Sequence, residues 1–144
     1  MVSREDVIRY LEAVHEHTVL HTLGMRVERY DPDEVVVATD VDARLYQPTG
    51  VVHGGVYVLM AESAASTAAA LSVDVTRFSV FGMEINANHL RPVTAGTLRA
   101  VARPVHKGRT TMVFSIEVRD DQERLVSVSR CTVAVRPRED GEGS

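Results

Sequence analysis

The sequence predicts an α+β domain in which a curved antiparallel sheet packs around one long helix. Two observations lead to this prediction. An apolar segment runs from Val56 to Leu71 directly after two glycines and is typical of a buried helix. Beyond residue 78, four long segments rich in β-branched residues follow one another and indicate strands. Because the apolar residues cover nearly every face of the helix, we expect other structure to surround most of it.

Length and composition indicate one folded unit of 144 residues, with 44% hydrophobic and 25% charged residues. The formal net charge of −4 provides no overall positive field, so we expect neither nucleic acid nor an anionic membrane as a partner. The single cysteine, Cys131, excludes an intramolecular disulfide and fits a cytoplasmic protein. The charged N-terminus lacks the apolar core of a signal peptide.

Residues 1–24 are expected to form a helical segment of the same domain. Ser3 can cap a helix with Asp6 at its third position, and apolar residues then follow at helical spacing. The pattern predicts one or two helices between residues 4 and about 22, broken near residues 15–17 and ended by Gly24.

The domain proper is expected to span residues 25–136. Segments 25–30 and 34–41 flank a turn at 31–33 and predict a hairpin. Four longer antiparallel strands are expected over residues 80–90, 96–105, 110–118 and 125–135. The tail, residues 137–144, is charged and glycine-rich, and we predict that it is disordered.

A first group of candidate site residues lies where the apolar helix begins. Gly54 and Gly55 follow His53, and a helix start presents free backbone N–H groups at the positive end of the helix dipole. Such a place suits a carbonyl oxygen that gains negative charge during acyl transfer. The alternative is a tight turn without a further role, and the triplet alone does not decide between the two.

Glu62 is the second candidate because it lies in the middle of the apolar helix. Burying an unpaired carboxylate is costly, and such groups often serve as general bases or nucleophiles. Ser66 lies one turn later on the same face. The alternative is that Glu62 faces a wet interface or forms a structural ion pair.

Other chemistries find little support in the sequence. It contains no Walker loop and no Gly-x-Gly-x-x-Gly, and Ser63 lacks the glycine-flanked elbow of an α/β-hydrolase. Cys131 lies between apolar strand residues and is interpreted as a core or interface thiol. His17 and His21 share a helix face but have no third ligand, so we expect no metal site.

The spacing of these residues resembles that of the hot-dog-fold thioesterases of the PaaI and 4-hydroxybenzoyl-CoA thioesterase type. The menaquinone-pathway and enterobactin proofreading thioesterases are especially similar. The residues that carry the resemblance are Gln47, the triplet His53-Gly54-Gly55, Glu62 nine residues after the histidine, and Ser66. Segments 84–93 and 106–109 also resemble the family, and the likeness covers roughly residues 20–136.

This resemblance implies a hot-dog fold and hydrolysis of an acyl-CoA thioester. The backbone amide of Gly54 and the side chain of Gln47 would polarise the thioester carbonyl, while Glu62 attacks it or activates water. His53 would lie close to the thioester, and Ser66 would hold the water or the substrate.

The resemblance also implies a homo-oligomer, a tetramer built as a dimer of dimers, with the site at a subunit interface. Glu62 of one subunit would there meet Gly54 of another. Coenzyme A would come with the substrate, so no bound cofactor is expected. The residues suggested to bind coenzyme A are Gly82, His89, Arg91, Lys107 and Arg109.

Two other functions stay open from the sequence. A non-catalytic acyl-CoA sensor would need a DNA-binding segment, and the N-terminal helices are short and acidic. A hydratase or dehydratase of this fold would carry its carboxylate and histidine together in a loop, whereas Glu62 is expected on a helix. The sequence decides neither the acyl group, aryl or medium-chain, nor whether Glu62 acts as nucleophile or base.

Overall fold

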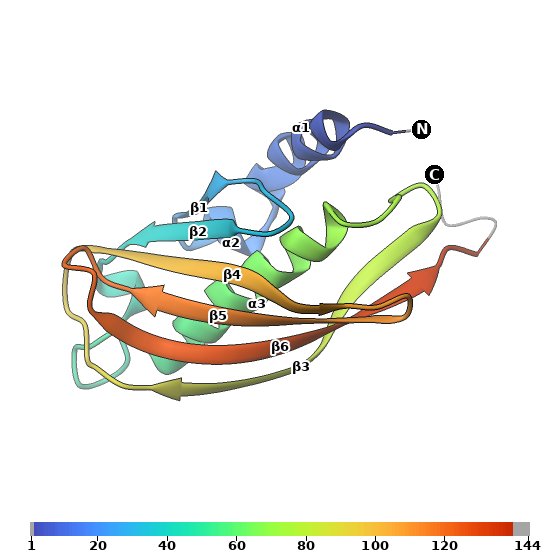
Figure 1. The fold of residues 1–144 in the computed structure, drawn as a ribbon. Helices are drawn as coiled ribbons and strands as arrows, with labels where there is room; N and C mark the ends of the chain where they lie inside the picture. The colour runs from blue at the N-terminus through green and yellow to red at the C-terminus, as the bar shows by residue number, and fades with distance from the viewer. Residues whose placement is uncertain (1, 140–144) are drawn as a thin grey trace.

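The structure is a computed structural model that describes residues 2–139 of the chain. Six antiparallel strands form one sheet in the order β1-β2-β4-β5-β6-β3, and this sheet curls around helix α3, Gly54–Ala70 (Figure 1). The strands are β1 Met25–Arg29, β2 Val35–Asp40, β3 Phe78–His89, β4 Thr97–Lys107, β5 Thr111–Arg119 and β6 Leu125–Pro137. The predicted α+β hot-dog fold is confirmed.

Helix α3 packs one face against the concave side of the sheet. Side chains from Met60 to Ala69 on this face are almost completely buried, and they meet Phe114, Val37 and Val133 of the sheet in the core. The opposite face is only partly buried within one chain; it consists of Leu59, Glu62, Ser63, Ser66, Thr67 and Ala70. The expectation that other structure covers most of the helix therefore holds for the face that packs against the sheet, but the face that carries Glu62 is only partly covered within one chain.

The N-terminal segment consists of α1, Arg4–Val14, the short 3-10 helix η1, His15–His17, and α2, Val19–Thr22. The predicted cap is present: the Ser3 hydroxyl accepts the Asp6 N–H at 3.1 Å, and the Asp6 carboxylate accepts the Ser3 N–H at 3.0 Å. Gly24, with φ 69°, ends the segment as expected. No helix within residues 2–139 has the length and hydropathy of a membrane span.

The strand boundaries differ by up to two residues from the predicted ones. Strand β3 begins at Phe78 because this residue pairs with Pro137 at the end of β6. Arg138 then donates its backbone N–H to the Arg77 carbonyl at 2.9 Å. The first residues of the predicted disordered tail therefore extend the sheet, and residues 140–144 lie outside the described part of the chain.

Strand β3 is one edge of the sheet. A bulge interrupts its pairing with β6 between Gly82 and Glu84, and its other side has no partner strand within the described chain. Two large apolar side chains near the bulge, Phe81 and Met83, are 59% and 58% exposed. An exposed, apolar edge strand is a template for pairing with a second chain.

Candidate active site

The loop before α3 is held in place by its own backbone. Tyr46 and Val52 form an isolated antiparallel bridge, and the Gln47 N–H donates to the Val51 carbonyl at 2.8 Å. Gly50 turns the chain at the tip with φ 82°, a conformation that favours glycine. This small hairpin holds the Gln47 backbone a few residues ahead of the helix start.

The first turn of α3 presents hydrogen-bond donors to its surroundings. His53 is the N-cap, and its Nδ1 accepts the Gly55 N–H at 2.8 Å. Since Nδ1 is an acceptor, the ring carries its proton on Nε2. The Gly54 N–H has no protein acceptor within residues 2–139. The helix start thus offers a backbone donor and an imidazole donor side by side.

His89 lies directly beside this helix start. A Cβ built on Gly54 would come within 2.7 Å of His89 Nε2, so the glycine permits the contact. The Ser127 hydroxyl donates to the Asn88 carbonyl at 3.2 Å, which leaves its oxygen to accept from His89 Nδ1 at 2.9 Å. The ring also packs against Tyr57, with centroids 5.2 Å apart. His89 was predicted to bind coenzyme A, and its position beside Gly54 was not predicted.

Glu62 occupies the partly buried face of α3, with Ser66 one turn further along. Its carboxylate lies against Gly82 of β3, where a Cβ would be only 2.2 Å from Glu62 Oε1. Within residues 2–139, Glu62 takes part in none of the ion pairs or side-chain hydrogen bonds. The carboxylate is therefore held by packing and is free to interact with a ligand.

Within one chain, the two groups of candidate residues lie apart. Glu62 follows Gly54 by eight residues of the same helix, which is about 12 Å at a rise of about 1.5 Å per residue. A single carbonyl group cannot contact both at bonding distance. Within one chain, the helix start with His53 and Gly54 is therefore separate from Glu62 and Ser66 on the open face of α3.

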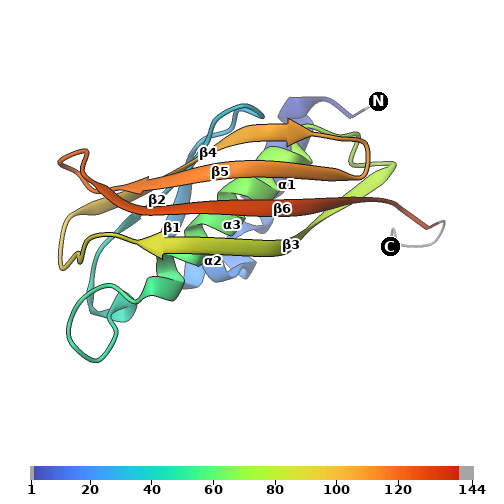
Figure 2. The same cartoon turned by 60° about the horizontal axis from the view of Figure 1, so that its bottom comes forward.

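The basic residues predicted to bind coenzyme A are also separated. Arg91 follows the end of β3, whereas Lys107 and Arg109 lie at the β4–β5 hairpin beside Phe78, where β3 begins (Figure 2). The 12 residues of β3 span roughly 36 Å at about 3.3 Å per residue. Lys107 Nζ is 2.7 Å from the carboxylate of Asp33, and this contact lowers the pKa of Asp33. One chain cannot place all three cations on one nucleotide.

Cys131 is fully buried, in agreement with its interpretation as a core thiol. Burial, followed by the nearby charges of Glu62 and Glu84, raises its pKa from 9.0 to about 11. A thiol of this kind is protonated at neutral pH and is a poor nucleophile.

A helix start with a free amide, and a carboxylate on the open face of the same helix, are groups that suit acyl-transfer chemistry. Residues 49–127 match the family described as the thioesterase superfamily, and the chain belongs to this family. The predicted resemblance and the predicted enzyme class, a thioester hydrolase, are therefore confirmed.

Individual relatives and a solved structure agree with the assignment to the thioesterase superfamily. The chain is 42% identical over 117 residues to 1,4-dihydroxy-2-naphthoyl-CoA hydrolase of Listeria monocytogenes, with 81% of this chain and 94% of the relative covered. It is 36% identical over 133 residues to the proofreading thioesterase EntH of Klebsiella pneumoniae, with 92% and 96% covered. The crystal structure of a mutant of thioesterase PA1618 from Pseudomonas aeruginosa matches with a TM-score of 0.86 and 38% identity, covering 90% of this chain and 94% of that one.

Proposed function

We propose that the protein hydrolyses aryl- or medium-chain acyl-CoA thioesters to the free acid and coenzyme A. The observation that carries this proposal is the partly buried carboxylate of Glu62, which has no protein partner within residues 2–139 and lies on the open face of α3. The name of the Listeria relative, a hydrolase of an aryl-CoA, supports the aryl class.

The active site is assembled from two subunits in this proposal. If β3 pairs with β3 of a second chain in antiparallel orientation, the start of one strand lies beside the end of the other. This pairing brings Glu62 and Ser66 of one subunit towards Gln47, His53 and Gly54 of its partner. It also pairs the free edge of β3, the strand that carries the exposed apolar side chains of Phe81 and Met83. The resulting dimer is the unit from which a dimer-of-dimers tetramer is built.

The same pairing accounts for the separated cations. Arg91 of one subunit would approach Lys107 and Arg109 of the other, because these residues lie at opposite ends of β3. Arginine and lysine are suited to the phosphates of coenzyme A. The pantetheine arm would pass Gly82, and His89 would line its path near the helix start. Coenzyme A arrives as part of the substrate, and we propose no further cofactor.

Each residue then has a chemical task. The Gly54 N–H and the Gln47 amide polarise the thioester carbonyl and stabilise the oxyanion that forms on it. Glu62 either attacks the carbonyl carbon, giving an anhydride that water opens, or takes a proton from an attacking water. On either route the carbon–sulfur bond breaks and coenzyme A leaves as a thiolate that takes up a proton. His53 Nε2–H and the Ser66 hydroxyl hold the reacting groups in place.

Thiol release from benzoyl-, 4-hydroxybenzoyl- and hexanoyl-CoA tests the proposal. We expect turnover by the wild type and a loss of at least about a hundredfold in kcat for Glu62→Gln. Glu5→Gln is the matched control, because it makes the same change at an exposed position of α1, outside both α3 and the proposed interface strand β3. Full activity of Glu62→Gln would contradict the role of Glu62, and the absence of thiol release from all three esters would favour an acyl-CoA sensor.

A further inference from the structure

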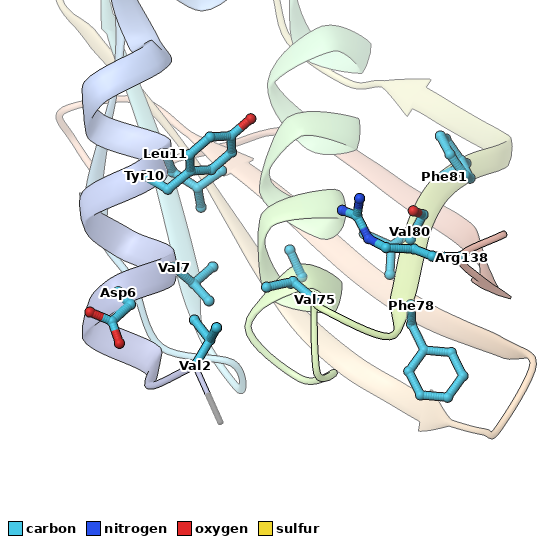
Figure 3. Close-up of a pocket in the computed structure, with 12 residues that line it drawn as sticks. Val2, Asp6, Val7, Tyr10, Leu11, Val75, Phe78, Val80, Phe81 and Arg138 are labelled. Atoms are coloured by element: carbon cyan, nitrogen blue, oxygen red, sulfur yellow. The ribbon is translucent and has the colours of Figure 1, made fainter. Parts of the chain in front are cut away.

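A groove of about 690 Å³ separates α1 from β3 and is floored by the C-terminal end of α3 (Figure 3). Its volume falls within the range of about 300–1,000 Å³ usual for small-molecule sites. Most of its lining is apolar, with contributions from Val7, Tyr10, Leu11, Ala70, Val75 and Val80. No local sequence pattern predicts this groove, because its walls come from segments about 70 residues apart.

Large apolar side chains are unusually exposed around the groove. Val2, Tyr10 and Phe81 line it and are 40%, 66% and 59% exposed. Phe81 lies on one side and Tyr10 on the other, as Figure 3 shows. Apolar surface gathered in a concavity marks a binding site more often than apolar residues scattered over a surface do.

Two elements, α3 and β3, run from the groove to the proposed reaction centre. On α3, Glu62, Ser66 and Ala70 follow one another at intervals of four residues and therefore lie on one face. Ala70 forms part of the groove, about 12 Å along the helix from Glu62. On β3, Gly82 touches the Glu62 carboxylate, and its neighbour Phe81 lines the groove.

We infer that this groove binds the acyl group of the substrate, which extends from the thioester at Glu62 past Ser66 and Ala70. The inference rests on the proposed function and assigns a binding place to its apolar acyl groups, alkyl or aryl, which are much larger than acetyl. It also assigns to α1 a role in binding the acyl group, because Tyr10 and Leu11 form the wall opposite β3. An acetyl group would leave this apolar surface in contact with water.

Binding of two non-hydrolysable thioethers, S-octyl-CoA and S-methyl-CoA, tests the assignment by calorimetry. Each buried methylene raises affinity about fourfold, so the wild type should prefer S-octyl-CoA by at least about a hundredfold. Ala70→Leu fills the floor of the groove and should reduce this preference at least about tenfold. Tyr10→Ser removes part of one wall and should reduce it at least about threefold. Both variants should bind S-methyl-CoA as the wild type does.

Val19→Ser is the matched control, because Val19 is 51% exposed on α2 and does not line the groove. Equal binding of the two thioethers by the wild type, or an octyl preference that survives both groove variants, would overturn the assignment. Tyr10 is 66% exposed, so Tyr10→Ser should fold, and it alone tests the assignment of the groove if Ala70→Leu fails to fold. Thioethers report on binding alone, so this test is separate from the test of activity. If the variants lose the octyl preference but the wild type releases no thiol from any ester, the proposed function is overturned and the assignment of the groove as an acyl-binding site stands.

Discussion

The carboxylate of Glu62 lies directly against the α-carbon of Gly82, on the edge strand of the sheet. A Cβ at residue 82 would come within 2.2 Å of Glu62 Oε1, so a side chain at this position would displace the carboxylate. The backbone of β3 thus positions the group that we propose to react with the thioester. The same strand carries the edge that we propose as the subunit interface.

Gly82→Ala should therefore lower kcat by at least about tenfold, because the carboxylate moves away from the carbonyl. The melting temperature should change little, since the displaced atoms are the end of a flexible side chain. Thiol-release kinetics and thermal unfolding measure the two effects. In a Glu62→Gln background the alanine should add no further loss, and an equal loss in both backgrounds would show that Gly82 acts independently of Glu62.

Gly54→Ala keeps the backbone N–H but places a Cβ 2.7 Å from His89 Nε2, and the imidazole must move. We expect a loss of about tenfold in kcat/KM from this displacement. A His89→Ala background removes the clash, so Gly54→Ala should cost clearly less there. If the glycine is needed for some other reason, the cost will be the same in both backgrounds.

The secondary structure was predictable where its signals are local. Helix α1 follows from Ser3, Asp6 and an apolar repeat, and α3 follows from its long apolar run. The start of β3 and the end of β6 were not predictable, because Phe78 and Pro137 are extended through their pairing with each other across 59 residues. Pairing over such a distance leaves no periodic pattern in either segment.

The site was predictable only in part, for a similar reason. Gly54 and Glu62 are conspicuous in the sequence because glycines open an apolar helix that contains a carboxylate. The contacts that orient them, from His89 and Gly82, depend on where β3 passes the helix. Ser127, which accepts from His89 Nδ1, is an ordinary strand serine 38 residues away, and no sequence signal could have identified it.

The pKa of Cys131, raised by burial to about 11, makes stability depend on pH in the alkaline range. Between pH 9.0 and about 11 the unfolded thiol loses its proton while the folded one keeps it, so the free energy of unfolding falls as pH rises. Denaturant unfolding of the wild type and of Cys131→Ala should reveal this, with a shallower alkaline decline in the variant. Identical declines would mean that the thiol titrates alike in both states.

Asp120 shapes the β5–β6 turn and should contribute stability at the acidic end. Burial opposes its ionisation, but the Arg124 and Gln122 N–H groups and the Arg124 guanidinium hold its pKa below 3.8. The ionised form therefore stabilises the fold above pH 3.8, and this contribution disappears as pH falls through the folded pKa. Asp120→Asn should lower the melting temperature at neutral pH, and the gap to the wild type should close in acid. A gap that is independent of pH would point to lost packing instead.

The division of the active site between subunits is tested most directly by combining two inactive chains. Glu62→Gln removes the reacting carboxylate, and Gly54→Pro removes the amide donor at a first helical position, where proline is tolerated. His53 is extended, with φ −63° and ψ 133°, as the residue before a proline should be. The two variants are co-expressed with different affinity tags, and the mixed oligomer is isolated.

Each variant alone should release almost no thiol from hexanoyl- or benzoyl-CoA. In a mixed dimer one of the two sites keeps both Glu62 and Gly54, so the purified mixed dimer should recover about half of the wild-type activity. If each site were built within one chain, every site would lack one group, and the mixed oligomer would be as inactive as its parents.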